Sequence, residues 1–243
     1  MSRKIGIVIP AYNESGNLYL LIGKIFTIIP QAKIVIVDDS NPEENEKMKK
    51  SLLVLKSSQK KKITILSRLN KQGRGNAVIS GFKEILKNKD IQYCFEMDAD
   101  LAHNPKDFHK FLQAMNSHNT DVVIGSRYLI KSKIIKWPLW RLVLSKIINN
   151  FIKVWLTVEI SDYTNGFRLY NRRAISFLTK TELREKGFIA LSEVAYKLKN
   201  NKFNIIEVPI EFTDRKRGKS SADFKEFSSA LIGIMRIKMQ KYH

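Results

Sequence analysis

The chain has 243 residues, 44% hydrophobic and 27% charged, a length that suits one large domain or two small ones. This balance of side chains excludes disorder and fibrous repeats as descriptions of the whole chain. Lys and Arg total 43 against 23 acids, and the net charge of +20 indicates an anionic partner. Nucleic acid, a phospholipid surface and a phosphorylated ligand all fit that description.

The sequence also bears on where the protein resides. The single cysteine, Cys94, excludes an intrachain disulfide and lends no support to an oxidising compartment. The first residues turn polar too early for a signal peptide. No apolar run approaches the ~20 residues that a membrane-spanning helix needs. We therefore expect a cytoplasmic protein that is soluble or peripheral to a membrane.

Short β-branched runs alternate with helical patterns in the first half of the chain. The expected strands are residues 5–9, 33–37, 63–66, 91–97 and 122–124, and the expected helices are residues 14–28, 43–55, 76–86 and 107–115. This order predicts an α/β fold with a mostly parallel sheet and helices on both faces. Ligands of such sheets bind beyond the carboxyl ends of the strands, where this chain places clusters of polar residues.

The pattern changes after residue 130. Residues 131–158 contain no acid, yet they carry all three tryptophans and a series of lysines. Apolar spacing predicts an amphipathic helix over residues 142–155, which either caps the core or lies on a membrane with its basic side chains near anionic headgroups. Farther along, we expect a polar turn segment over 162–170, a strand over 203–212 broken by Pro209, and a closing amphipathic helix over 224–239.

The acidic pair Asp98 and Asp100 is the strongest single chemical signal. Two carboxylates one residue apart at the end of a strand can hold Mg²⁺ or Mn²⁺, and such an ion can bridge the phosphates of a nucleotide. The alternative is a solvated turn that caps a helix.

His103, as a lone histidine, is expected to have a structural or surface role, and Cys94 is expected to be a small buried hydrophobe.

Several motifs, taken in chain order, give the acidic pair a wider context. They are PAYNE from Pro10, VDDS from Val37, GRGNA from Gly73, MDADLAHNP from Met97, GSRY from Gly125, SDYTNGFRLY from Ser161 and EVPI from Glu207. Together they resemble family 2 glycosyltransferases with the GT-A fold, and most closely the dolichyl- or polyprenyl-phosphate mannose synthases. The resemblance runs over nearly the whole chain. It implies one GT-A domain over residues 1–243, with a nucleotide-sugar half (1–130) and an acceptor-binding, membrane-proximal half (131–243).

The resemblance also implies roles for individual residues. The nucleotide pocket would be formed by Pro10, Tyr12, Glu14, Val37, Asp39 and Ala99. Asp98 and Asp100 would hold the metal, and a basic segment with Arg215 and Lys219 would close over the diphosphate. Arg127 would contact phosphate, which suits a guanidinium fork. We expect Arg127 and Arg141 to bind the acceptor phosphate, with Asp162 orienting its neighbours.

Two positions depart from the family pattern. Ala102 offers no ligand where many of these synthases carry a polar residue that can help the metal, and Ser221 stands where the basic segment usually has Lys. These departures bear on the sugar and on the nucleotide. The choice between Arg217 and Lys219 as the contact to the donor phosphates also stays open.

The expected reaction is an inverting, metal-dependent transfer of mannose from GDP-mannose to a polyprenyl phosphate at the cytoplasmic face of an anionic membrane. A lipid phosphate, with a second pKa of about 6, is already ionised and needs no general base. The same-family alternative uses a UDP-sugar and a hydroxyl acceptor, for which Asp162 or Glu193 would be the base. A nucleic-acid-binding protein is the other alternative, but the sequence lacks the usual motifs of that class. Whether the protein also requires a small membrane-protein partner stays open.

Overall fold

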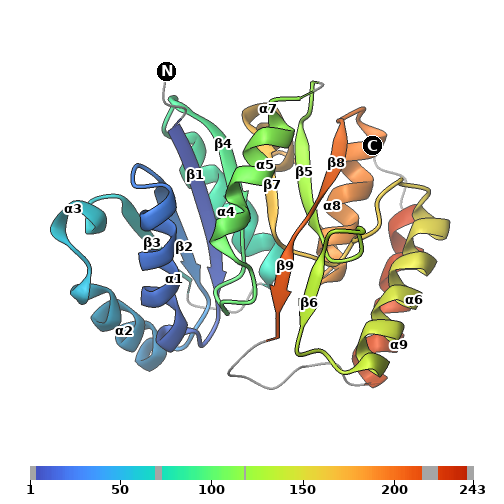
Figure 1. Cartoon of the computed structure of the whole chain (residues 1–243), viewed down its shortest axis with the longest axis horizontal. Helices are drawn as coiled ribbons and strands as arrows, with labels where there is room; N and C mark the ends of the chain where they lie inside the picture. The colour runs from blue at the N-terminus through green and yellow to red at the C-terminus, as the bar shows by residue number, and fades with distance from the viewer. Residues whose placement is uncertain (1–3, 69–72, 118, 215–223, 240–243) are drawn as a thin grey trace.

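The computed structural model describes residues 4–68, 73–117, 119–214 and 224–239. Within these residues a seven-stranded sheet forms the centre, with the strand order β3-β2-β1-β4-β7-β5-β8 (Figure 1). Its strands are β1 (Lys4–Ala11), β2 (Lys33–Asp38), β3 (Ile63–Ser67), β4 (Ile91–Glu96), β5 (Val122–Ser126), β7 (Arg168–Asn171) and β8 (Ile205–Pro209). A second, two-stranded sheet pairs β6 (Lys133–Ile135) with β9 (Glu211–Thr213).

The sheet is mostly parallel, as the sequence predicts. β1 pairs in parallel with β2 and β4, β2 with β3, and β5 with β8. β7 is the exception, because it runs antiparallel to both of its neighbours, β4 and β5. The expected break at Pro209 is confirmed, since β8 ends there at the edge of the main sheet and the chain continues into β9.

The polar turn segment expected over 162–170 is wrong at its end, because β7 begins at Arg168. The Arg168 side chain is fully buried, and its guanidinium donates to the backbone carbonyls of Asn165, Tyr163 and Leu191. A buried charge is tolerated only when its donors are satisfied, and these carbonyls supply that. Arg168 can therefore start a central strand, although its residue type is unusual there.

Helices cover the sheet. They are α1 (Ser15–Ile28), α2 (Pro42–Ser51), α3 (Ser57–Lys60), α4 (Arg74–Leu86), α5 (Phe108–Met115), α6 (Leu139–Leu156), α7 (Arg172–Leu178), α8 (Ile189–Asn200) and α9 (Phe224–Met239), with short 3₁₀ turns at Leu52–Val54 and Pro105–Asp107. Of these, α6 to α9 lie in the second half of the chain. The predicted first-half helices are confirmed with small shifts. α2 stops at Ser51 rather than at residue 55, and α4 begins at Arg74. None of the described helices is long and apolar enough to cross a bilayer.

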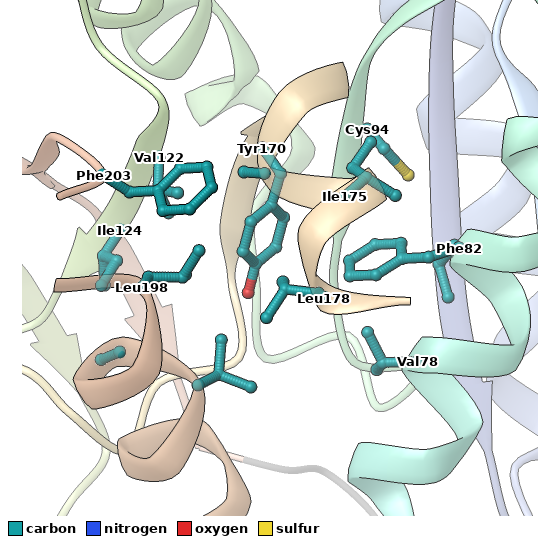
Figure 2. Close-up of a cluster of buried hydrophobic side chains, with 14 of the residues drawn as sticks. Val78, Phe82, Cys94, Val122, Ile124, Tyr170, Ile175, Leu178, Leu198 and Phe203 are labelled. Atoms are coloured by element: carbon teal, nitrogen blue, oxygen red, sulfur yellow. The ribbon is translucent and has the colours of Figure 1, made fainter. Parts of the chain in front are cut away.

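The buried side chains form two apolar clusters. Figure 2 shows one of them, in which Phe82 of α4 meets Tyr170 of β7 edge-on at 5.2 Å between ring centroids. Tyr170 donates its hydroxyl to Glu96, so this core reaches to the end of β4. Cys94 lies in the same cluster, as expected, and burial raises the pKa of its thiol well above the usual value.

α6 has two different faces, so the core-capping alternative is confirmed for one of them and the membrane alternative stays a prediction for the other. Asn149, Ile152 and Leu156 are buried against the rest of the molecule, and α9 packs alongside (Figure 1). The opposite face carries large apolar side chains that are exposed to solvent, namely Leu139, Trp140, Val143, Leu144, Ile147, Phe151 and Val154. We call these seven residues the outer face of α6.

Candidate active site

The site residues gather at the carboxyl edge of the central sheet, because parallel strands end on the same side. β1, β2, β4 and β5 all finish there, while antiparallel β7 starts there and brings the Asn165-Gly166 segment with it. Pro10 of β1 lies opposite Val37 of β2 in the parallel register. The first strand ends therefore bring together residues that the resemblance assigns to the nucleotide pocket.

Asp39 is held by an arginine at this edge. Its two carboxylate oxygens accept from Nε and Nη2 of Arg68 at 2.5 and 2.6 Å, and its backbone N–H donates to Ala11. Tyr12 beside it is exposed, whereas Glu14 accepts from Asn17 at the start of α1. The sequence reasoning missed Arg68, although its position directly after β3 follows the same rule that selected the other strand ends.

Asp98, the first predicted metal ligand, is paired with an arginine of α4. Arg74 donates from Nε at 2.9 Å and from Nη2 at 2.7 Å to the same oxygen, Oδ1, and its Nη1 donates to buried Glu96. Burial alone would lower the pKa of Arg74, but the charges of Asp98 and Glu96 outweigh it and raise that pKa. The GRGNA motif contained the signal for Arg74, but the residue itself was not selected.

Gly166 makes this pairing sterically feasible. A Cβ at position 166 would lie 2.0 Å from Nη2 of Arg74 and 3.1 Å from Oδ2 of Asp98, which no side chain could tolerate without displacing the arginine. The Asn165-Gly166 segment thus packs against Arg74 and Asp98 from the side of β7. Its glycine is required by this close approach and not by a turn.

Asp100, the second predicted metal ligand, belongs to a tight turn after β4. Its Oδ1 accepts the backbone N–H of Ala102 at 3.0 Å, and Leu101 between them adopts a left-handed φ of +64°. Ala99, between the two aspartates in sequence, is buried. Thr213 of β9 donates its backbone N–H to the carbonyl of Ala102 and so ties the second sheet to this turn.

The carboxylates of Asp98 and Asp100 suit a divalent ion that is also bound by the phosphates of a nucleotide. Asp98 and Asp100 offer hard carboxylate oxygens within one turn, and Mg²⁺ and Mn²⁺ prefer such oxygens. Among the described residues no group of three or more His, Cys, Asp or Glu side chains could enclose a metal. Two carboxylates fit an ion that completes its coordination with phosphate and water, and do not fit an all-protein cage.

On the other side of the edge, Arg127 and Asp162 form a buried pair. Nε and Nη2 of Arg127 donate to the two oxygens of Asp162 at 2.7 and 2.8 Å, and the side chains are 7% and 0% exposed. Burial alone would lower the pKa of Arg127, but Asp162 raises it. Glu207 of β8 fixes the pair by accepting the backbone N–H groups of Ser161 and Asp162, and burial raises the pKa of Glu207.

Trp137 brings the two predicted acceptor arginines together. The guanidinium carbons of Arg127 and Arg141 lie 5.2 and 4.4 Å from the centre of its ring. Arg141, at the start of α6, also donates to Asp214 at 3.0 Å. Within the described part of the chain, Nε1 of Trp137 is buried without a hydrogen-bond partner. The cluster therefore combines two guanidinium groups, each already paired with a carboxylate, and one donor without a partner, so an anion could bind where Arg141 exchanges Asp214 for it.

The remaining predicted residues fall into two groups. Arg215 and Lys219 lie outside the described residues, so their expected contact with a diphosphate stays a prediction. Glu193, the alternative base, lies in α8 at 0% exposure, where it pairs with Lys197 at 2.9 Å and accepts backbone N–H groups of Arg184 and Glu185. It takes no part in the cluster around Arg127.

Curated relatives match almost the full chain. Polyprenol monophosphomannose synthase of Mycolicibacterium smegmatis is 32% identical over 228 residues, which cover 94% of this chain and 84% of that protein. Undecaprenyl-phosphate mannosyltransferase of Micrococcus luteus is 27% identical over 94% of this chain and 91% of its own. Dolichol-phosphate mannosyltransferase of Pyrococcus furiosus is 32% identical over 96% of this chain, but only 63% of that protein is covered.

Solved structures identify the fold. Glucosyl-3-phosphoglycerate synthase of Mycobacterium tuberculosis, crystallised with Mn²⁺, UDP and phosphoglyceric acid, superimposes with a TM-score of 0.66 at 12% identity, over 98% of this chain and 78% of that chain. The likeness confirms the GT-A, Rossmann-like architecture that the sequence predicts. The family model for glycosyl transferase family 2 matches residues 6–178. The chain is therefore a glycosyltransferase and belongs to glycosyl transferase family 2.

Proposed function

We propose that this glycosyltransferase transfers mannose from GDP-mannose to the phosphate of a polyprenyl lipid, with inversion at the sugar carbon and with a divalent metal ion. The names of the relatives from M. smegmatis, M. luteus and P. furiosus all describe mannosyl transfer to a polyprenol or its phosphate, and the first two matches cover most of both chains. These names support mannose as the sugar and a polyprenyl phosphate as the acceptor. The described side chains supply the reason to prefer a phosphate over a hydroxyl.

The state of Asp162 and Glu193 carries the proposal. A hydroxyl acceptor needs a general base within hydrogen-bond reach of its proton. Both candidates for that role are 0% exposed and paired with a cation, Asp162 with Arg127 and Glu193 with Lys197. A phosphate monoester is largely ionised near pH 7, since its second pKa is about 6, so it needs positioning and positive charge instead.

Arg127 and Arg141 offer that positive charge in one place, around the ring of Trp137. We assign them to the acceptor phosphate, with Asp162 holding Arg127 in position and not accepting a proton. Arg141 is a quarter exposed and can exchange Asp214 for a phosphate oxygen. A guanidinium can bind phosphate through two parallel hydrogen bonds, which favours arginine over lysine at such a position.

The donor is assigned to the opposite side of the same edge. Asp39, with Pro10, Tyr12, Glu14, Val37 and Ala99, would surround the nucleotide, and Asp98 and Asp100 would hold the metal. A divalent cation there would neutralise the charge that develops on the departing nucleoside diphosphate. Arg74 already supplies a positive charge at Asp98 in this structure.

We place the protein on the cytoplasmic face of a membrane with an anionic surface. The outer face of α6 exposes Trp140 and Val154 at 64% and 79%, and residues 131–158 carry lysines and no acid. Apolar side chains with flanking lysines are the usual composition of a helix that lies in the bilayer interface. A lipid acceptor would be reached from such a position.

The decisive experiment is a donor and acceptor panel. The purified protein is incubated with radiolabelled GDP-mannose, GDP-glucose or UDP-glucose, with Mg²⁺, Mn²⁺ or EDTA, and with polyprenyl phosphate or the free polyprenol. We expect a charged mannolipid only with GDP-mannose, a metal and the phosphate, and NMR of its anomeric carbon should show inversion. Transfer to polyprenol or to a soluble sugar hydroxyl, with the lipid phosphate unused, would refute the proposal.

A further inference from the structure

A directed chain of hydrogen bonds runs through His103. Nδ1 of His103 lies 3.3 Å from the backbone nitrogen of Asp98, and Nε2 lies 2.8 Å from Oδ1 of Asn165. A backbone N–H can only donate, so Nδ1 must accept and the ring proton must be on Nε2. His103 then donates to Asn165.

The orientation of Asn165 agrees with this assignment. Its amide nitrogen, Nδ2, donates to the backbone carbonyl of Gly125 in β5, and a carbonyl can only accept. Oδ1 is thereby turned toward His103. Every donor in the series from Asp98 through His103 and Asn165 to Gly125 has an acceptor, so the segment after β4 and the segment before β7 are joined to β5 by hydrogen bonds of defined direction.

Packing leaves the imidazole little freedom. His103 is 2% exposed, and its ring stacks on Phe167 with 5.0 Å between centroids and 18° between planes. Phe212 of β9 lies edge-on at 5.7 Å and also forms a backbone bridge with His103. The ring is therefore held on its face by Phe167, on its edge by Phe212 and at both nitrogens by hydrogen bonds.

We infer that His103 is a positioning residue for the metal turn, holding the backbone of Asp98 so that the carboxylates of Asp98 and Asp100 face one ion. The turn between Asp98 and His103 contains the left-handed Leu101, a conformation that costs free energy for a non-glycine residue. His103 spans this turn and fixes its first residue from its last. The inference rests on the metal-binding part of the proposed function, but on no assumption about the acceptor.

A merely structural role makes a different prediction. If His103 only fills space in the core, any replacement should lower the stability of the protein and the affinity for metal together. If it positions Asp98, only the loss of the acceptor at Nδ1 should weaken metal binding. The side chains of asparagine and glutamine separate these cases, because the amide of Asn reaches the place of Nδ1 and the amide of Gln reaches the place of Nε2.

The test compares His103→Asn with His103→Gln in the full chain. Binding of Mn²⁺ in the presence of GDP is measured by electron paramagnetic resonance of the free ion, and the thermal midpoint of each variant by circular dichroism. We expect His103→Gln to weaken Mn²⁺ binding roughly 10- to 100-fold, the usual effect of removing an outer-shell partner of a metal ligand. His103→Asn should bind Mn²⁺ within about 3-fold of wild type, because its amide oxygen keeps the acceptor for Asp98. A change of that size corresponds to less than the 1.4 kcal/mol of a tenfold change in affinity.

His109→Gln is the matched control, because His109 is an exposed histidine of α5 outside the turn, and it should bind Mn²⁺ as wild type does. Equal affinities in His103→Asn and His103→Gln would overturn the inference. If His103→Gln does not fold, His103→Phe, which keeps an aromatic ring on Phe167 but has no acceptor, should weaken Mn²⁺ binding instead, and unchanged binding would again overturn the inference. Failure of the wild-type chain to bind Mn²⁺ with GDP would refute the metal site itself, which is a separate result.

Discussion

The two halves of the carboxyl edge hold their charges in opposite ways. On the side of β1 to β4, carboxylates are the residues assigned to ligands, and arginines pair with them, Arg68 with Asp39 and Arg74 with Asp98. On the side of β5 and α6, arginines are the assigned residues, and carboxylates pair with them, Asp162 with Arg127 and Asp214 with Arg141.

This difference teaches how one edge can serve two anionic ligands. A phosphate that is bound through a divalent metal ion needs carboxylates on the protein side, because they coordinate the ion and the ion holds the phosphate. A phosphate without a metal is best met by guanidinium groups. In both halves the ion pairs keep buried charges compensated, and only pairs with some exposure, such as Arg141 with Asp214, can exchange partners at low cost.

The largest expected effect comes from breaking the carboxylate side. Asp100→Asn replaces a charged metal ligand by a neutral amide of the same shape, so the fold should be kept while turnover falls by roughly 100- to 1,000-fold, the range for one lost preorganised electrostatic group. EDTA should reduce the wild-type rate similarly. The measurement is the initial rate of glycolipid formation. Asp90→Asn, at an exposed acid that pairs with Lys4, is the control, and full activity of Asp100→Asn in EDTA would contradict the metal assignment.

Breaking the arginine side should act on the acceptor alone. Arg141→Lys keeps the charge but loses the bidentate geometry, at a cost of roughly 2–4 kcal/mol in transition-state stabilisation. Transfer to lipid phosphate should fall far more than slow hydrolysis of the donor, and both rates are measured on the same samples. Arg173→Lys, at an exposed arginine paired with Asp121, is the control. An equal loss of both rates would assign Arg141 to the donor instead.

The surfaces of the two halves give the next prediction. α2 pairs its charges on the surface, as Lys47 does with Glu43 and Glu44, whereas α6 exposes its apolar outer face. Sedimentation with anionic vesicles should therefore depend on the α6 region. Lys133→Glu with Lys136→Glu should weaken binding, since each basic residue near the surface contributes about 1 kcal/mol, and added salt should weaken it further.

Lys49→Glu with Lys50→Glu makes the same change in charge on α2 and should leave vesicle binding near the wild-type level. Equal losses in the two double variants would mean that overall charge, and not the face of α6, governs binding. Equal recovery of the wild-type protein from neutral and anionic vesicles would contradict the membrane assignment.

The smallest effect concerns Glu207, which accepts the backbone N–H groups of Ser161 and Asp162 and so supports the pair of Asp162 with Arg127. Burial raises the pKa of Glu207, so the folded state binds this proton more tightly than the unfolded state does. Its contribution to the free energy of unfolding is therefore largest below the unfolded pKa and declines as pH rises through the folded pKa. Denaturant unfolding is measured as pH rises from the unfolded to the folded pKa of Glu207. Over this range the free energy of unfolding should decline less steeply in Glu207→Gln than in wild type. Glu159→Gln, at an exposed carboxylate, should keep the wild-type slope.

The sequence was most informative where consecutive apolar residues form a buried strand. Residues 5–9 and 33–37 are β-branched runs between turn signals, and their strands, their parallel order and the polar residues at their ends were all predictable. β7 was not, because it is short and starts with an arginine whose donors are satisfied by carbonyls distant in sequence. Local composition cannot reveal such partners.

The candidate site shows the same limit. Asp98 and Asp162 stand in recognisable motifs, so their selection needed no structure. Their partners Arg74 and Arg127 lie 24 and 35 residues away along the chain, and only the fold brings them into contact. Arg127 was selected for phosphate. Arg74 was not selected, although its GRGNA motif was, because the motif alone does not say that this arginine contacts Glu96 and Asp98.

The single cysteine gives the protein a practical property. Cys94 lies inside the core with its thiol pKa raised, so little of it is thiolate and labelling reagents should not reach it. The wild-type chain can thus serve as a silent background for thiol chemistry. A cysteine introduced at Val154 on α6 or at Glu46 on α2 would be the one reactive thiol in each variant. An environment-sensitive dye at each position would then report whether that side of the molecule enters a bilayer.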